Sequence, residues 1–211
     1  MRDRLLGTML VIAKEPRPGY VKTRLVPPLT HEQAAEIAGA ALWDTLRAVG
    51  QVPARDLLLA FDGDHSHWLP EGWRSTPQPV GDLDTRLVAA FAAAGPGPAV
   101  LVGMDTPQVQ AENITAFDPS RYDACLGPAT DGGYWAIGFT DPRHATAGIS
   151  GIPMSTDRTG ADQLRRLSEL GLQVQMLDEL TDVDTIESAR DVARIASGST
   201  FAAALAKAVH R

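Results

Sequence analysis

Short, continuous runs of apolar, β-forming residues constrain the fold of this chain more than any other feature. The clearest runs are residues 8–13 (TMLVIA), 56–61 (DLLLAF), 99–103 (AVLVG) and 134–139 (YWAIGF). Strands that read as unbroken apolar runs are typically buried on both faces. Because helical segments separate most of these runs, the order of elements predicts an α/β fold with a mostly parallel sheet covered on both faces.

The helical segments carry recognisable start and stop signals. Thr30, with Gln33 three residues later, has the pattern of a capping box, which predicts a helix to about Val49. Asp82 or Asp84 is expected to cap a second helix, which the sequence Gly-Pro-Gly-Pro over residues 95–98 ends. The remaining expected elements are a short helix after residue 107, strands near 124–126 and 172–177, a helix over 162–170, and a helical C-terminal region broken at 197–198.

Length and composition predict one globular domain. The 211 residues are 44% hydrophobic and show no repeat, no low-complexity linker and no shift in composition, so we expect a single domain over residues 1–211. No apolar run reaches the roughly 18 residues of a membrane-spanning helix. The first seven residues lack a small-residue cleavage site, which argues against a signal peptide. The lone Cys125 cannot form an internal disulfide or a thiolate metal cluster. We therefore expect a cytoplasmic protein in which Cys125 is an inert, buried thiol; the oligomeric state cannot be predicted.

The charge pattern narrows the class of ligand. A net charge of -7 argues against binding to nucleic acid or to an anionic membrane. Only three of the 19 basic residues are lysines, yet Lys14 and Lys22 lie close together and beside Arg17 and Arg24. A local cationic segment in an acidic protein indicates an anionic small-molecule ligand.

Ligands of open α/β sheets bind at the carboxyl ends of the strands, so polar residues after the apolar runs are the candidates. The first candidate is the loop of residues 14–24, which we call the first loop. Lys22, Arg24 and Lys14 could bind a di- or triphosphate there, although the spacing is not that of a P-loop. The alternative is a solvated surface turn.

Two further candidates contain aspartate. Asp105 directly follows the apolar run 99–103 and could hold Mg²⁺ or Mn²⁺ between phosphate oxygens; alternatively it forms an Asx-turn or caps a helix. In Asp131-Gly132-Gly133, the glycines would let the backbone approach a ligand while the aspartate binds sugar hydroxyls or a base. A hairpin turn is the strong alternative, since Asp-Gly is a leading hairpin dipeptide.

The fourth candidate is a set of Asp-x-Asp pairs, whose carboxylates suit hard cations. They are Asp62/Asp64, Asp82/Asp84 and Asp182/Asp184. The first pair also lies near His65 and His67 and makes the best-looking metal cluster on local chemistry alone. Three occurrences in one acidic chain show that the pattern arises easily.

Taken together, these loops resemble a known family. The motifs are AKEPRPGYVKTRL (13–25), PPLT (27–30), GDL (81–83) followed by RL (86–87), GMDTP (103–107), GPATDGGY (127–134), ST (155–156) and DVDT (182–185). The chain resembles bacterial glycosyltransferases of the arsenosugar-biosynthesis type. It is also similar to the nucleotidyltransferases of the same superfold, such as the guanylyltransferases of molybdenum-cofactor and phospholactate metabolism. This resemblance implies a GT-A-like, nucleotide-diphospho-sugar transferase fold, a Rossmann-like three-layer sandwich.

The resemblance also implies roles for particular residues. Lys22, Thr23 and Arg24 would bind phosphate with Lys14, and Asp105 would hold the metal, with Asp184 as a possible second ligand. Asp131, Gly132 and Gly133 would form part of the acceptor or nucleoside pocket, and Asp82 would help to bind substrate. From its position before the apolar run 134–139, we expect Asp131 to bind substrate hydroxyls or to act in catalysis as a general base, with Asp105 as the other catalytic residue. Asp84 departs from the glycine expected in the GDL motif, which puts close backbone approach at that loop in doubt.

These observations predict a transferase that depends on Mg²⁺ or Mn²⁺ and acts on a nucleotide-activated donor and a small-molecule acceptor. Glycosyl transfer from a nucleotide sugar is the first hypothesis. Nucleotidyl transfer from an NTP with release of pyrophosphate is the alternative, and a non-catalytic nucleotide-binding module is the third.

Overall fold

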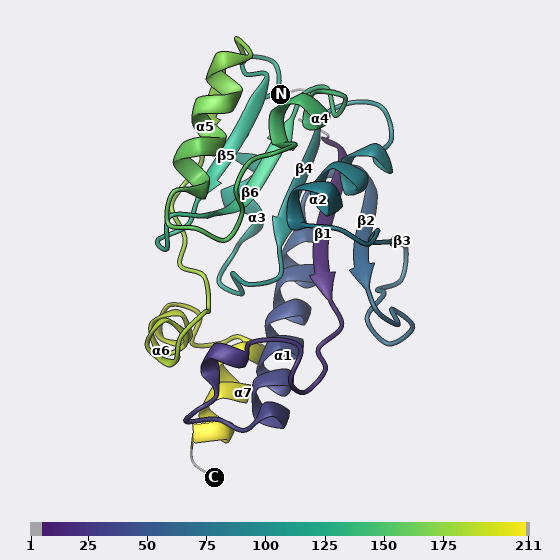
Figure 1. Cartoon of the computed structure of the whole chain (residues 1–211). Helices are drawn as coiled ribbons and strands as arrows, with labels where there is room; N and C mark the ends of the chain where they lie inside the picture. Colours follow the sequence, from purple (N-terminus) through teal and green to yellow (C-terminus); the bar gives the residue numbers. More distant parts are fainter. Residues whose placement is uncertain (1–5, 210–211) are drawn as a thin grey trace.

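A computed structural model of the chain describes residues 6–209, and seven strands lie in that range (Figure 1). They are β1 (Leu6–Lys14), β2 (Ala54–Asp62), β3 (Arg74–Pro77), β4 (Ala99–Gly103), β5 (Ala124–Pro128), β6 (Tyr134–Phe139) and β7 (Val174–Met176). They form one sheet in the order β3-β2-β1-β4-β6-β5-β7. Only β6 runs antiparallel to its neighbours, β4 and β5. The other strands therefore end at one edge of the sheet, and β6 begins there.

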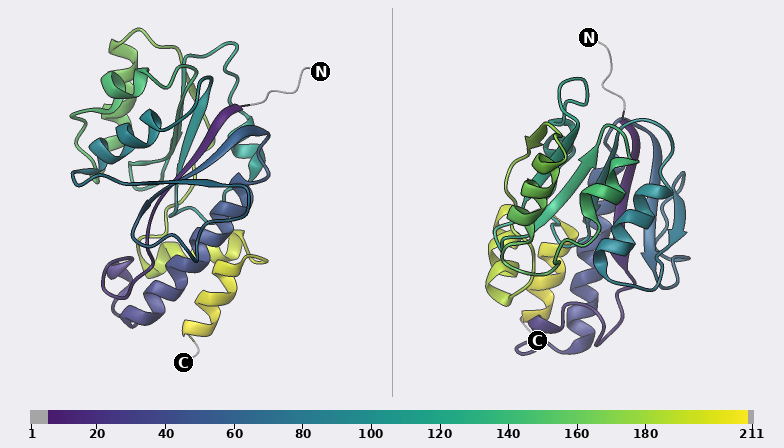
Figure 2. Two further views of the ribbon diagram at one scale, coloured as in Figure 1. Left: turned by 90° about the vertical axis from the view of Figure 1, so that its right-hand side faces the viewer. Right: turned by 45° about the horizontal axis from the view of Figure 1, so that its top comes forward.

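Helices cover both faces of this sheet, as the two views of Figure 2 show. They are η1 (Thr23–Leu25), α1 (His31–Val49), α2 (Leu83–Ala92), α3 (Ala111–Thr115), α4 (His144–Ile149), α5 (Thr159–Glu169), α6 (Ile186–Ile195) and α7 (Thr200–Val209). One apolar core joins α1 and α3 to the sheet through residues such as Leu42, Met9 and Phe117. A second core joins α2, α4 and α5 to the opposite face, and the result is the expected three-layer arrangement.

A third apolar cluster lies beyond the carboxyl edge of the sheet. It packs α1 against α6 and α7, and it includes Leu25 of η1, just after the first loop, together with Ile37, Val183, Val192 and Phe201. We call it the anchor cluster. It fixes both the first loop and residues around 183 next to the edge where the strands end.

The predicted α/β class with a mostly parallel sheet is confirmed, and so is the capping box of α1. Thr30 accepts a hydrogen bond from the amide of Gln33, whose side chain accepts one from the amide of Thr30. Asp82 holds the N-cap position of α2, although its carboxylate makes no cap hydrogen bond. The break at 197–198 lies between α6 and α7, as predicted.

Apart from the short 3-10 helix η1, two elements were not predicted. β3 is a four-residue edge strand of sequence RSTP, which has no apolar run and depends on its parallel pairing with β2. α4 has six residues and no side-chain cap, so it is too short for its periodicity to be visible. Both elements are stabilised by tertiary contacts rather than by local sequence.

Cys125 is fully buried, and burial raises the pKa of its thiol, as expected for an inert cysteine. Within residues 6–209, no helix is long and apolar enough to cross a membrane. Residues 1–5, on which part of the signal-peptide prediction rests, lie outside the described residues.

A buried carboxylate connects α1 to α7. Asp44 is almost fully buried on α1, and its oxygens accept hydrogen bonds from the amides of Thr200 (3.2 Å) and Phe201 (2.7 Å) at the start of α7. Arg47 forms an ion pair with the same carboxylate. Amides at a helix N-terminus lack partners within the helix, so Asp44 caps α7 from another helix.

We predict that Asp44→Ala lowers the free energy of unfolding by about 1–3 kcal/mol, because buried amides of α7 lose their acceptor. Chemical denaturation measures this change, and hydrogen exchange should report faster opening of α7. Asp191→Ala is the matched control, since Asp191 pairs with Arg194 on the exposed face of α6 and should cost less than about 0.5 kcal/mol. Equal effects of the two substitutions would contradict the capping role.

Candidate functional site

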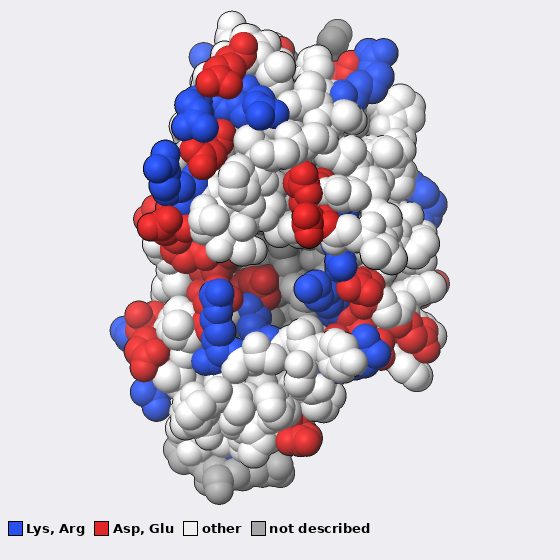
Figure 3. Space-filling view, in the orientation of Figure 1, with Lys and Arg blue, Asp and Glu red and all other residues white. Residues whose placement is uncertain are grey.

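A cleft of about 790 Å³ opens at the carboxyl edge of the sheet. Figure 3 shows this hollow across the middle of the molecule, with charged side chains around its rim. Its lining comes from the first loop, the end of β4, the hairpin before β6, residues 154–159 and residues 182–185. These segments include most of the places that the sequence analysis selected.

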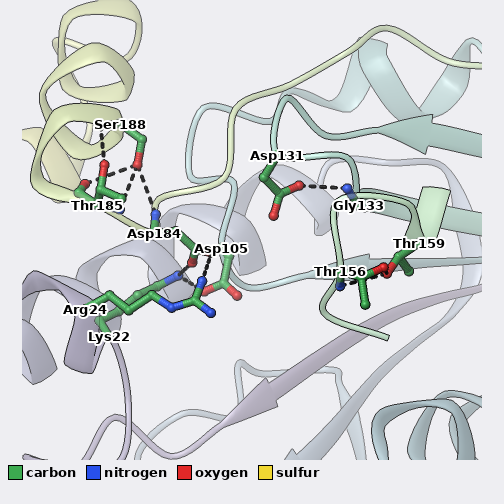
Figure 4. A network of polar contacts seen from close by, with 10 residues as sticks. All are labelled: Lys22, Arg24, Asp105, Asp131, Gly133, Thr156, Thr159, Asp184, Thr185 and Ser188. Atoms are coloured by element: carbon green, nitrogen blue, oxygen red, sulfur yellow. Dashed lines mark hydrogen bonds and ion pairs between the residues drawn. The ribbon is translucent and has the colours of Figure 1, made fainter. Parts of the chain in front are cut away.

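Lys22 lies at the centre of the charged part of the cleft. Its side chain is only 7% exposed, and its Nζ atom lies 2.5 Å from Oδ1 of Asp105 and 3.4 Å from Oδ1 of Asp184. Arg24 is exposed and contacts the other oxygen, Oδ2 of Asp184, at 3.1 Å (Figure 4). The structure therefore brings together four of the predicted site residues.

The electrostatics of this group follow from burial and neighbouring charge. Burial alone would lower the pKa of Lys22, but the carboxylates of Asp105 and Asp184 outweigh it and hold that pKa above its ordinary value. Burial raises the pKa of Asp182 to about 7, and repulsion from Asp105 and Asp131 adds to the effect. Oδ1 of Asp182 is buried, and no described residue forms a hydrogen bond with it. Asp182 is thus a site residue that the sequence analysis included only in a common Asp-x-Asp pattern.

Backbone contacts explain why Asp105 and Asp184 meet. The amide of Val183 donates to the carbonyl of Asp105 (2.9 Å), and the side-chain amide of the buried Gln108 donates to the carbonyl of Thr181 (2.8 Å). Val183 itself is buried in the anchor cluster. Hydrogen bonds therefore hold the segment before α6 against the residues that follow β4. Asp182 and Asp184 lie on either side of the buried Val183.

Asp131 lies in the hairpin between β5 and β6, so the hairpin interpretation of its Asp-Gly sequence is confirmed. Its Oδ1 atom accepts a hydrogen bond from the amide of Gly133 at 2.8 Å. The carboxylate is nevertheless exposed and lines the cleft. Figure 4 shows Asp131 and Gly133 across from the group of Lys22, Arg24, Asp105 and Asp184.

Gly132 is required by packing within the protein. Its φ is +89°, and a Cβ atom there would lie 2.0 Å from the carbonyl oxygen of Asp157. Its own carbonyl accepts a hydrogen bond from the amide of Gly160 at 2.8 Å. Gly132 is not among the residues that line the cleft, whereas Gly133 is. The hairpin therefore packs backbone to backbone against the turn around Asp157.

Some of the remaining predicted residues line the cleft and others do not. Lys14 and Thr23 line the cleft, but Asp82 does not, although its neighbours Gly81 and Leu83 do. Gln78 and Arg86 also line it and were not selected from the sequence. Arg86 belongs to the RL motif quoted above, while Gln78 follows the unpredicted β3 and had no sequence signal.

The Asp62/Asp64 pair does not form a metal cluster. Asp62 is paired with Arg86 at 2.8 Å, and Asp64 accepts a hydrogen bond from the amide of Ser66. Across residues 6–209, no group of three or more His, Cys, Asp or Glu side chains could hold a metal ion. A metal at Asp105 and Asp184 would therefore need further ligands from a substrate, as is usual for Mg²⁺.

Asp84, which departs from the expected glycine, ties two segments together. One carboxylate oxygen accepts from the amide of Thr85 at 2.7 Å, and the other accepts from the amide of Gly151 at 2.9 Å. The second contact connects the first turn of α2 to the chain after α4. Asp84 thus has a clear structural role.

Comparisons with known proteins identify a family. A family model described as "Uncharacterized protein conserved in bacteria (DUF2064)" matches residues 45–156, just over half of the chain. No curated protein sequence gives a significant match.

Solved structures match over almost the whole chain. One is described as a "putative nucleotide-diphospho-sugar transferase" from Desulfovibrio desulfuricans G20, with 28% identity, a TM-score of 0.85 and coverage of 95% of this chain and 94% of that one. Another is 2-C-methyl-D-erythritol 4-phosphate cytidylyltransferase from Thermus thermophilus, with 15% identity, a TM-score of 0.54 and coverage of 97% and 98%. A third is Rv0371c from Mycobacterium tuberculosis H37Rv in complex with manganese, with 21% identity, a TM-score of 0.52 and coverage of 89% and 97%. The predicted fold, that of the nucleotide-diphospho-sugar transferases, is confirmed.

We predict that Gly132→Ala destabilises the protein more than Gly171→Ala does. Both glycines have positive φ, but a Cβ atom at Gly171 would meet nothing within 4 Å. The difference in the free energy of unfolding should be about 1–3 kcal/mol, the usual cost of overpacking. Denaturant titration of both variants measures it, and a difference near zero would mean that the contact with Asp157 is not tight.

Proposed function

The chain belongs to the DUF2064 family of bacterial proteins, and we propose that it is a metal-dependent transferase that moves a sugar from a nucleotide-activated donor to a small-molecule acceptor. One observation carries the proposal. A single cleft at the carboxyl edge has cations and paired carboxylates at one end and the exposed carboxylate of Asp131 at the other. Its structural neighbours, which include nucleotide-diphospho-sugar transferases and cytidylyltransferases, support a nucleotide-utilising transferase.

The cationic end suits the donor diphosphate. Lys22, Arg24 and Lys14 would bind its oxygens, and the Thr23 hydroxyl lies beside them in the cleft lining. Charge-assisted hydrogen bonds of this kind contribute about 1.5–3 kcal/mol each. Asp82 is the weakest member of the proposed substrate-binding set because it does not line the cleft, although its neighbours Gly81 and Leu83 do.

Asp105 and Asp184 would hold Mg²⁺ or Mn²⁺. Their hard carboxylate oxygens fit such an ion, and two carboxylates completed by substrate phosphates are a common arrangement for Mg²⁺. When bound, the ion would neutralise negative charge on the diphosphate that leaves the sugar. The manganese complex of the M. tuberculosis protein supports a divalent metal in this fold.

The opposite wall suits a hydroxyl acceptor. Between residues 131 and 159, the cleft is lined by the carboxylates of Asp131 and Asp157, hydroxyl groups including Thr156, and the apolar Met154. No Lys or Arg side chain lines this described segment. Carboxylates bind sugar hydroxyls but repel a phosphorylated acceptor, so the wall favours glycosyl transfer over attack by a phosphate group.

Asp131 would act as the general base or bind the acceptor hydroxyl. Its carboxylate is exposed on the acceptor wall, while Gly132 and Gly133 shape the hairpin that presents it. As a base, it would remove the proton from the attacking hydroxyl as the bond between sugar and diphosphate breaks.

Nucleotidyl transfer is a second candidate, because the cations of the first loop would bind a triphosphate as well as a diphosphate. The two reactions differ in their products. Glycosyl transfer releases a nucleoside diphosphate from a nucleotide sugar, whereas nucleotidyl transfer releases pyrophosphate from an NTP. A panel of nucleotide sugars and NTPs with Mn²⁺ and hydroxylated acceptors should give only the first product.

We predict that Asp131→Asn lowers turnover about 10²–10⁴-fold, the range for loss of a general base. Donor affinity and melting temperature should be retained, because asparagine can still accept the hydrogen bond from Gly133. Asp64→Asn is the matched control, since Asp64 accepts a hydrogen bond from the amide two residues on, outside the cleft.

The turnover of the control should stay within about twofold of the parent. Loss of acceptor affinity with little loss of maximal rate would make Asp131 a binding group. Unchanged turnover in Asp131→Asn would show that Asp131 is only a turn residue.

In the substrate panel, pyrophosphate release, or tight nucleotide binding with no turnover, would contradict glycosyl transfer.

A further inference from the structure

The ammonium group of Lys22 contacts the same two carboxylates to which the metal is assigned above. Its Nζ atom lies 2.5 Å from Oδ1 of Asp105 and 3.4 Å from Oδ1 of Asp184. The side chain is only 7% exposed, so these contacts replace contacts with water. Lys22 therefore acts as the counter-ion of this acidic group in the protein without substrate.

A divalent cation and this ammonium group compete for the same oxygens. Both are positive, and both are attracted to the carboxylates of Asp105 and Asp184, where Lys22 already contacts one oxygen of each. Repulsion between two cations is strongest where water is excluded, and the side chain of Lys22 is 7% exposed beside carboxylates that are 44% and 34% exposed. A metal that binds the oxygens that Lys22 contacts must therefore displace the ammonium group from them.

The Lys22 side chain can move away from Asp105 and Asp184 while the neighbouring residues of the loop stay in place. Val21 and Leu25 are buried on either side, and Leu25 belongs to the anchor cluster. Lys22 itself has a left-handed backbone conformation (φ 49°), which few residues other than glycine adopt. A long lysine side chain can swing by rotation about its own bonds, so displacement does not require the loop to unfold.

We propose that Lys22 is a built-in counter-ion that blocks the metal site until donor phosphates attract it away. The proposal rests on the function proposed above and adds a regulatory property to that site. Phosphate oxygens would take over Lys22, and the freed carboxylates would take up the metal. Metal and nucleotide would then bind cooperatively, and each would raise the affinity of the other by the same factor.

Arg24 provides a natural comparison. Its side chain is 72% exposed, and its ion pair is with Asp184 rather than with Asp105. An exposed, solvated ion pair offers a metal little competition. The proposal therefore assigns different effects to the two cations of the first loop when no nucleotide is present.

The test measures Mn²⁺ binding by electron paramagnetic resonance. Wild-type protein, Lys22→Met and the control Arg24→Met would be titrated with Mn²⁺ alone, and then with Mn²⁺ and each of ADP, CDP, GDP and UDP. The titrations need correction for Mn²⁺ bound by free nucleotide. Circular dichroism would verify folding, and Lys22→Gln would replace Lys22→Met if that variant did not fold.

Without nucleotide, Lys22→Met should bind Mn²⁺ about tenfold more tightly than wild type, a typical coupling factor, whereas Arg24→Met should change the affinity less than about threefold. Adding Asp105→Asn to Lys22→Met should abolish the gain, which would place the ion at Asp105. In wild type, one of the nucleotides should tighten Mn²⁺ binding about tenfold, and this coupling should be smaller in Lys22→Met.

Equal Mn²⁺ affinity of wild type and Lys22→Met would overturn the proposal, as would equal gains from Lys22→Met and Arg24→Met. A gain in Lys22→Met that persists with Asp105→Asn would also overturn it, because the ion would then bind elsewhere. If Lys22→Met binds Mn²⁺ more tightly but no nucleotide affects any variant, the counter-ion role is supported, whereas the release of Lys22 by donor phosphates and the proposed nucleotide-dependent function both fail.

Discussion

The anchor cluster is the constraint on which the rest of the site depends. Leu25 follows the cations of the first loop, and Val183 lies between two aspartates of the C-terminal segment; both are buried in this one cluster. Burial of apolar side chains thus offsets two costs next to the sheet: the charged groups lose hydration, and like charges lie close together. The residues that would bind phosphate and metal come from segments 160 positions apart in sequence, as the contact between Arg24 and Asp184 shows. The charged group is a consequence of hydrophobic packing just behind it.

The single antiparallel strand determines the shape of the opposite wall. Because β6 runs against β4 and β5, the hairpin that precedes it lies at the same edge as the carboxyl ends of the parallel strands. A fully parallel sheet would need a crossover at this point, and the start of such a strand would lie at the other edge. The reversal therefore gives the cleft a second wall with its own chemistry, carboxylates and hydroxyl groups in place of cations.

Local sequence patterns predicted the long elements and the polar loops next to apolar runs, which is why Lys22, Asp105 and Asp131 could be selected in advance. The sheet class and the capping box of α1 also follow from local pattern. The pairing of Lys22 with Asp105 could not be predicted, because it depends on how the anchor cluster places distant segments. The burial and raised pKa of Asp182 could not be predicted for a similar reason, because they depend on packing and on carboxylates elsewhere in the chain. Gln78 follows a strand that exists only through its pairing with β2.

The contact of Gly132 with the backbone of Asp157 has a consequence for how such a protein can evolve. The hairpin and the turn around Asp157 touch through main-chain atoms, and Gly132 and Gly160 share a hydrogen bond. Neither segment can change length or gain bulk without displacing the other. A change in one segment would therefore require a compensating change in the other. Gly132 and Gly160 thus join the hairpin and the turn around Asp157 into one structural unit.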